Sequence, residues 1–96
     1  MNNNYTPTPV DTSDITLDAK LLELTELIAE NCHELWAVGR YKEGWIFGET
    51  KDSEKKTNPC LVPYNELPES EKEYDRVTTM ETLKLIVKLG YKITKE

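Results

Sequence analysis

The sequence predicts a mainly α-helical protein with two principal amphipathic helices, a short helical turn and a small two-stranded antiparallel β element. Two long segments carry apolar residues at the three- and four-residue steps of a helix. Between them, aromatic residues alternate between glycines, as in a short strand. The 96 residues are fewer than one typical domain contains, so we expect one domain with a small core that a partner would help to cover.

Residues 1–9 are expected to form a flexible arm, because residues that precede Pro favour an extended backbone. The folded domain is then expected over residues 10–96. The arm has neither the basic nor the apolar region of a secretory signal. No apolar stretch approaches the roughly 20 residues that span a bilayer. With Cys32 and Cys60 expected as reduced thiols, the sequence predicts a cytoplasmic protein with no membrane partner.

The first helix is expected from about Leu17 to Tyr41. Its predicted core face consists of Leu17, Leu21, Leu24, Ile28, Asn31 and Leu35. Its predicted solvated stripe consists of Glu23, Glu26, Glu30 and Glu34. A second apolar line, Leu22, Ala29 and Trp36, lies off the core face at seven-residue spacing. Because one neighbour cannot cover so wide an apolar arc, we predict that this line forms an interface, most simply in a homodimer.

The β element is expected from Gly44 to Gly48 and from Cys60 to Val62, with the flanking prolines confining the second strand to an edge. The polar segment from Glu49 to Asn58 is too long for a tight hairpin turn, so we expect it to be mobile.

A short helical turn is expected from Leu67 to about Tyr74, with Pro68 near its start. The second principal helix should begin at a capping box formed by Thr78 and Glu81. It should end before Gly90, a residue type favoured just after a helix. This helix is also apolar over more than half of its circumference, so it too should have two neighbours.

Charge and motif spacing exclude several classes of function. The formal net charge is −6, which disfavours nucleic-acid binding because that binding depends on basic side chains that neutralise phosphates. His33 and Glu34 begin like a zinc-protease motif, but the second His four residues on is missing. Cys32, His33 and Cys60 are too few and too badly spaced for structural zinc. We therefore expect no enzyme, metal or cofactor, and interpret His33 as a hydrogen-bonded imidazole beside a core-facing Cys32 thiol.

Two features leave alternatives open. The first is the acidic cluster of Glu69, Glu71, Glu73 and Asp75 with Lys72 and Arg76. A salt-bridged surface is its ordinary meaning, and acid–base catalysis is the alternative. The second is the pair Trp36 and Trp45, which are either core anchors or ring platforms for a flat ligand.

Seven motifs, in this order, resemble the ryanodine-receptor (RyR) repeat domain family. They are DTS at 11–13, AENCHELWA at 29–37, GWIFG at 44–48, NPCLVPY at 58–64, EKEYDR at 71–76, ETLK at 81–84 and LGY at 89–91. The resemblance extends from Val10 to Ile93, and the chain looks like a single-copy prokaryotic or phage-type relative. It implies a mainly helical unit that forms half of a pseudo-two-fold pair, so that homodimerisation of a lone copy would rebuild the pair.

The resemblance also implies a function. The cleft between paired repeats can hold an adenine nucleotide against the Trp that matches Trp36, with Arg40 as phosphate partner and His33 flanking them, while Trp45 stays structural. The expected function is thus a non-enzymatic, homodimeric binding or sensing module for a nucleotide-type small molecule. The alternative is a protein–protein interaction adaptor that uses Leu22, Ala29 and Trp36 and has no small-molecule ligand.

Overall fold

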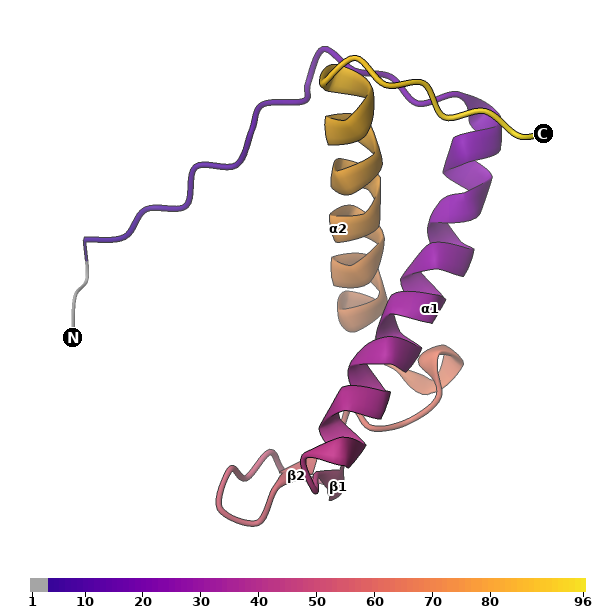
Figure 1. Cartoon of the computed structure of the whole chain (residues 1–96). Helices are drawn as coiled ribbons and strands as arrows, with labels where there is room; N and C mark the ends of the chain where they lie inside the picture. Colours follow the sequence, from indigo (N-terminus) through magenta and orange to yellow (C-terminus); the bar gives the residue numbers. More distant parts are fainter. Residues whose placement is uncertain (1–3) are drawn as a thin grey trace.

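A computed structural model describes residues 4–96 as two antiparallel helices with a small irregular lobe at one end (Figure 1). Helix α1 spans Ala19–Lys42 and helix α2 spans Glu69–Lys88. Between them lie strand β1 (Ile46–Phe47), strand β2 (Thr57–Asn58) and the 3₁₀ turn η1 (Tyr64–Glu66). The predicted mainly helical class, with two long helices, a short helical turn and a two-stranded β element, is confirmed.

Helix α1 begins two residues later than predicted because Asp18 caps it. The Asp18 carboxylate accepts a hydrogen bond from the Leu21 backbone N–H at 2.9 Å. Arg40 and Lys42 lie in the last turn, where positive charge suits the helix dipole. These end signals fix the helix over its 24 residues.

The core lies where α1 meets η1 and the segment that leads into α2. Ala29 has no exposed surface and packs with Tyr64 and Leu67. Thr25 and His33, one turn before and after Ala29, are buried as well. Ala29 is therefore part of this chain's core. The line of Leu22, Ala29 and Trp36, which was predicted to form an interface, is interrupted by this buried residue and is not one continuous outer surface.

Much of the predicted core face of α1 is exposed instead. Leu17 is buried, but Leu24 is 43% exposed and Leu35 is 64% exposed. Asn31, between them, is also exposed. This part of the prediction is wrong because the rest of the chain covers the face of Thr25, Ala29 and His33, which the spacing of the leucines does not identify.

The two strands pair in parallel, so the predicted antiparallel order is wrong. Ile46 lies opposite Thr57, and Phe47 lies opposite Asn58. The chain reverses direction twice between them, because Asp52 first forms an antiparallel bridge with Thr57. The Asp52 carboxylate also accepts hydrogen bonds from two following backbone N–H groups at 2.9 and 3.2 Å. These contacts give the loop a defined turn, and its mobility stays a prediction.

Strand β2 precedes the segment that was predicted to form it. The side-chain oxygen of Asn58 accepts a hydrogen bond from the Cys60 N–H at 2.8 Å, and Pro59 has no N–H to offer a strand partner. The chain therefore turns at Pro59 and leaves the sheet. Leu61 is then buried, and Val62 reaches the edge of the core.

Helix α2 is continuous, so the predicted break between Tyr74 and Thr78 is wrong. The helix starts directly after Pro68, with Glu69 and Glu71 in its first turn. The separate short turn is η1, which comes earlier in the chain than predicted.

Thr78 and Glu81 lie inside α2 and do not cap it. The Thr78 carbonyl accepts from the Thr82 hydroxyl at 2.8 Å, and Glu81 accepts from the Thr12 hydroxyl at 2.6 Å. The second contact ties the N-terminal segment to α2. The predicted stop at Gly90 is confirmed, since Gly90 has a φ of +99°, in the left-handed region.

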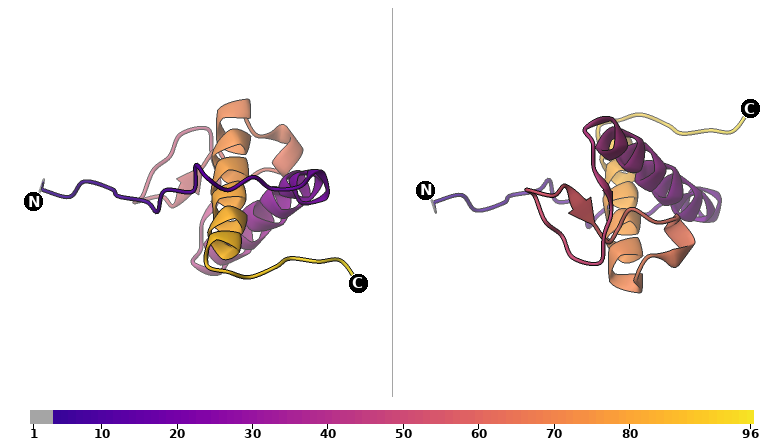
Figure 2. Two further views of the ribbon diagram at one scale, coloured as in Figure 1. Left: turned by 90° about the horizontal axis from the view of Figure 1, so that it is seen from above. Right: turned by 90° about the horizontal axis from the view of Figure 1, so that it is seen from below.

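The two ends of the chain leave the molecule near the end of α2 (Figure 2). The Lys88 ammonium donates to the Asp11 carbonyl at 2.6 Å and pairs with Asp14 at 3.1 Å. Residues 4–9 of the predicted arm contain no helix or strand, and residues 1–3 lie outside the described residues. Over residues 4–96, neither helix has the length and apolar character needed to cross a membrane.

Candidate ligand-binding site

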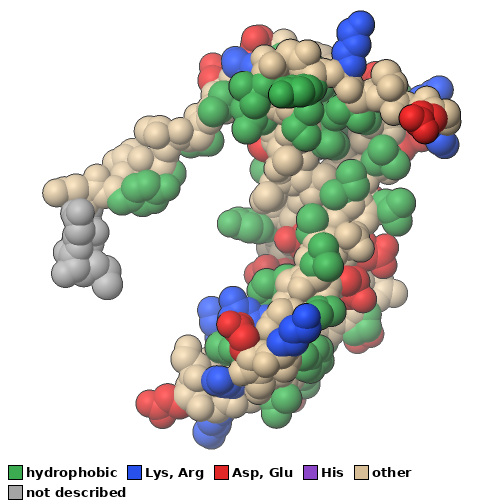
Figure 3. Space-filling view, in the orientation of Figure 1, with side chains coloured by type: hydrophobic (Ala, Val, Ile, Leu, Met, Phe, Trp, Pro, Cys, Tyr) green, Lys and Arg blue, Asp and Glu red, His purple; other side chains and the backbone are tan. Residues whose placement is uncertain are grey.

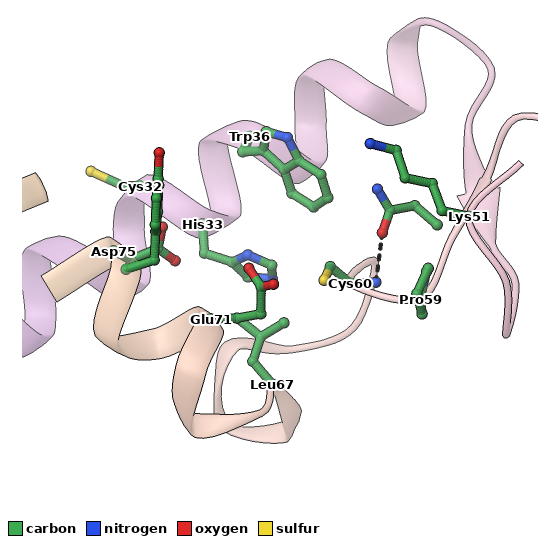
Figure 4. Close-up of a pocket in the computed structure, with 11 residues that line it drawn as sticks. Cys32, His33, Trp36, Lys51, Pro59, Cys60, Leu67, Glu71 and Asp75 are labelled. Carbon is green, nitrogen blue, oxygen red and sulfur yellow. Dashed lines mark hydrogen bonds between the residues drawn. The ribbon is translucent and has the colours of Figure 1, made fainter. Parts of the chain in front are cut away.

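A pocket of about 480 Å³ opens where α1, the first turns of α2 and the turn after β2 meet (Figure 4). We call it the larger pocket. Helix α1 contributes His33 and Trp36, and α2 contributes Glu71 and Asp75. Lys51 lies on the opposite side from Asp75. The volume falls within the range of small-molecule sites, roughly 300–1,000 Å³.

His33 joins α1 to the chain segment after β2. Its Nε2 lies 2.7 Å from the Val62 carbonyl oxygen. Because a carbonyl can only accept, Nε2 carries the proton and donates it. The predicted hydrogen-bonded imidazole is confirmed, whereas Cys32, which was predicted to face the core, is exposed.

Trp36 is half-buried and borders two pockets. On one side the His33 ring stacks on it, with the ring centroids 5.5 Å apart and an interplanar angle of 26°. Trp36 also lines a second pocket of about 200 Å³, which we call the smaller pocket. Its other lining residues include Arg40, Trp45, Lys51 and Ser53. One indole ring is therefore available to both pockets.

Arg40 lies between the two tryptophans. Its guanidinium carbon is 5.9 Å from the Trp36 ring centroid and 5.5 Å from that of Trp45. It also pairs with Glu43 at 3.1 Å. The three residues predicted to bind a ligand, His33, Trp36 and Arg40, thus lie together on one face of α1. Trp45, which the resemblance suggested as a structural residue, also lines the smaller pocket.

The acidic cluster at the start of α2 separates into two pairs. Glu69 and Glu73 contact Arg76 at 3.1 and 3.4 Å, so the salt-bridge interpretation holds for these two. Glu71 and Asp75, four residues apart, line the larger pocket instead. The sequence did contain a signal for this division, because residues four apart share a helix face while residues two apart do not.

The pocket also alters two ionisable groups. Burial raises the pKa of the Asp75 carboxyl, nearby His33 lowers it, and Glu71 raises it further. Burial likewise raises the pKa of the Cys60 thiol, with Glu71 and Asp75 adding to the effect. A thiol with a raised pKa is mostly protonated at neutral pH and is a poor nucleophile.

An ion pair beside the site connects the two helices. Arg76 donates from Nε and Nη2 to both carboxylate oxygens of Glu26, which the sequence had placed on a solvated stripe. This contact lowers the pKa of Glu26 and raises that of Arg76. The pair helps to set how α2, and with it Glu71 and Asp75, lies against α1.

In residues 4–96 no group of three or more His, Cys, Asp or Glu side chains is placed to hold a metal ion. A comparison with protein families gives a match over nearly the whole chain. The model of the RyR domain matches residues 5–95. The match begins within the segment predicted as an arm and includes every residue of both pockets.

Proposed function

The chain belongs to the RyR domain family, and from this membership and the site geometry we propose that it is a non-enzymatic, homodimeric binding or sensing module for a nucleotide-type small molecule. The observation that carries the proposal is the position of Trp36 between a pocket lined by Glu71 and Asp75 and a pocket lined by Arg40, with Lys51 bordering both. A nucleotide has the same division, with a hydrogen-donating base at one end and phosphate at the other.

The larger pocket, which Glu71 and Asp75 line, suits a nucleotide base. Stacking of a base on an aromatic ring contributes about 1–3 kcal/mol, and Trp36 offers such a ring. Glu71 and Asp75 line the same pocket, and carboxylates accept hydrogen bonds from the exocyclic amine of a base. An adenine or cytosine ring therefore fits this side better than a phosphate, which the two carboxylates would repel.

The smaller pocket suits a phosphate. Arg40 and Lys51 both line the smaller pocket, and Ser53 adds a hydroxyl donor. A guanidinium binds phosphate through two parallel hydrogen bonds. Glu43 holds Arg40 at 3.1 Å, so a bound phosphate would take the place of this carboxylate.

A homodimer is supported by the small size of the core. The buried hydrophobic residues are Leu17, Ala29, Leu61, Tyr64 and Leu67. Among residues 4–96 no large side chain is fully buried. A second copy would add to the apolar surface that this small core buries, and both cysteines here are free, so no disulfide reinforces the fold.

Tryptophan fluorescence titrations with adenosine and with AMP test the ligand proposal. Arg40→Gln should weaken AMP binding about 10-fold or more while leaving adenosine binding unchanged, because a hydrogen bond to a charged group contributes about 1.5–3 kcal/mol. Trp36→Ala should abolish the binding of both. The matched control is Glu43→Gln, which keeps Arg40 and removes the carboxylate that competes with phosphate, so AMP binding should be unchanged or tighter. If neither compound binds the wild type, or if Arg40→Gln weakens both equally, the proposal is wrong.

The adaptor function is favoured by one observation, the exposed leucines of α1. Light scattering on the Trp36→Ala variant separates the two functions. A dimer that has lost nucleotide binding supports the sensing module. A wild type that no mono-, di- or cyclic nucleotide stabilises in a thermal-shift screen supports the adaptor.

A further inference from the structure

One face of α1 carries a stripe of exposed side chains, four of them apolar and one polar. We call it the outer stripe, and it consists of Leu24, Leu27, Asn31, Leu35 and Val38. Leu27 is 63% exposed and Val38 is 51% exposed. At about 100° per residue, these positions lie opposite the buried Ala29. Figure 3 shows hydrophobic side chains along the visible side of α1.

The outer stripe has the same spacing in both directions from Asn31. Leucines lie four residues before and after it, at Leu27 and Leu35. Leu24 and Val38 lie seven residues before and after it. In an antiparallel pair of identical helices, a residue a given number of places before the two-fold axis meets the residue the same number of places after it. The stripe is therefore complementary to itself.

We propose that two copies of the chain pack through the outer stripe as an antiparallel helix pair, with Asn31 on the two-fold axis. Leu27 then packs against Leu35 of the second copy, and Leu24 packs against Val38 of the second copy. The two Asn31 amides meet, and each can donate and accept a hydrogen bond. A single polar residue inside an apolar helix interface fixes its register.

The inference rests on the homodimer of the proposed function and specifies its surface. It replaces the line Leu22, Ala29 and Trp36, because Ala29 is buried within its own chain. It also leaves both pockets open, since neither is lined by a residue of the outer stripe. Each copy then holds the ligand in its own pockets, in place of the cleft between paired repeats that the resemblance implied. Antiparallel packing further places each helix dipole against the opposite end of its neighbour.

The contact should be weak. The outer stripe extends over about 21 Å of helix and is about 10 Å wide. Its area is therefore well below the roughly 800 Å² that each partner buries in a standard interface. We therefore expect a dimer whose population changes with concentration in the micromolar range or above. In this antiparallel pair, the side of the stripe that carries Glu30 and Glu34 lies next to the same side of the second copy. Glu34 therefore comes near Glu30 of the second copy. Added salt should screen this repulsion and tighten the dimer.

Disulfide cross-linking in a Cys32→Ser/Cys60→Ser background tests the geometry, with circular dichroism as a check that the background folds. Asn31→Cys should cross-link to itself, and an equal mixture of Leu27→Cys and Leu35→Cys should give the mixed disulfide. Leu27→Cys alone should not cross-link, because its two copies are about 12 Å apart along the helix and disulfides need Cα atoms within about 7 Å. Self-cross-linking of Leu27→Cys indicates a parallel pair and overturns the proposal. Cross-linking of Leu22→Cys in place of Asn31→Cys overturns it as well.

Sedimentation equilibrium of the full chain over a concentration series provides the second test. Leu35→Glu should lower the association constant at least about 30-fold. The matched control Leu22→Glu changes an exposed leucine on the other side of α1 and should leave the constant unchanged. If the dimer survives Leu35→Glu, the homodimer of the proposed function stands, but the outer stripe is not its interface. A chain that is monomeric at every concentration overturns both the surface and the homodimer, and AMP titration then judges the ligand proposal separately.

Discussion

The two faces of α1 reverse the pattern of an ordinary amphipathic helix. The inner face, which η1 and the approach to α2 cover, presents Thr25, Ala29 and His33. The outer face presents leucines at Leu27 and Leu35, both exposed by more than 60%. The inner face needs a small residue where Tyr64 and Leu67 pack, and a polar one where it meets the Val62 carbonyl. The buried face of a helix can thus be the less hydrophobic one when a close fit and a binding site determine its residues.

Enlarging Ala29 is expected to give the largest effect on the inner face. Ala29→Leu should lower the free energy of unfolding by about 1–3 kcal/mol, because a well-packed core does not accept added methylene groups. Leu27→Ala, the matched change on the outer face, should alter it by no more than about 0.5 kcal/mol. Urea unfolding at a protein concentration below dimerisation measures both. An equal loss in the two variants would show that the faces do not differ as described.

Replacing His33 is expected to have a smaller effect on stability and a clear effect on the site. His33→Leu leaves the half-buried Val62 carbonyl without its donor and should cost about 1–2 kcal/mol. It also removes the ring that stacks on Trp36, so the tryptophan emission maximum should shift. His33→Gln, which keeps an N–H donor, should recover part of the stability but not the emission. A variant that recovered both, or neither, would contradict the roles given to the ring and to its N–H.

The smallest effect is expected at the Glu26–Arg76 pair, which lies between the two faces. Arg76 lowers the pKa of Glu26 in the fold, so this carboxylate adds stability above its usual value of 4.5 and loses it as the pH falls through the lowered value. Glu26→Gln should therefore flatten the loss of thermal stability between neutral and acidic pH. The effect should be modest, because both side chains are partly exposed.

Glu23→Gln is the control for this pH dependence, because Glu23 is an exposed carboxylate on the same helix. It should leave the acid-induced loss of stability closer to that of the wild type. A steeper loss in Glu26→Gln than in the wild type would contradict the sign of the linkage.

The sequence was sufficient to predict elements whose ends depend on local chemistry. Helix α1 was predicted to within two residues at its start, and Gly90 was predicted as the residue that ends α2. Prediction failed where the outcome depends on distant contacts. The parallel pairing of two-residue strands follows from the turn at Asp52, and Thr78 could not cap a helix that had already begun after Pro68.

The candidate site was predicted on one helix only. His33, Trp36 and Arg40 share a face of α1, so their proximity follows from helical spacing. Glu71 and Asp75 come from α2, and Lys51 comes from the loop, so their approach depends on tertiary packing that a local pattern does not contain. The same limit explains why Ala29 was expected on an interface and Leu35 in the core.

The central claim is that α1 binds ligand with one face and a second copy with the other. The most direct test is a two-dimensional ¹⁵N–¹H NMR experiment on the wild type, first with AMP added to a dilute sample and then along a dilution series. We predict that AMP shifts the indole N–H signal of Trp36 and leaves the amides of Leu27 and Leu35 in place. Dilution should shift those amides and leave the indole unchanged. If the same signals respond to both, or if dilution moves Leu22 and Trp36 instead, the account of two separate faces is wrong.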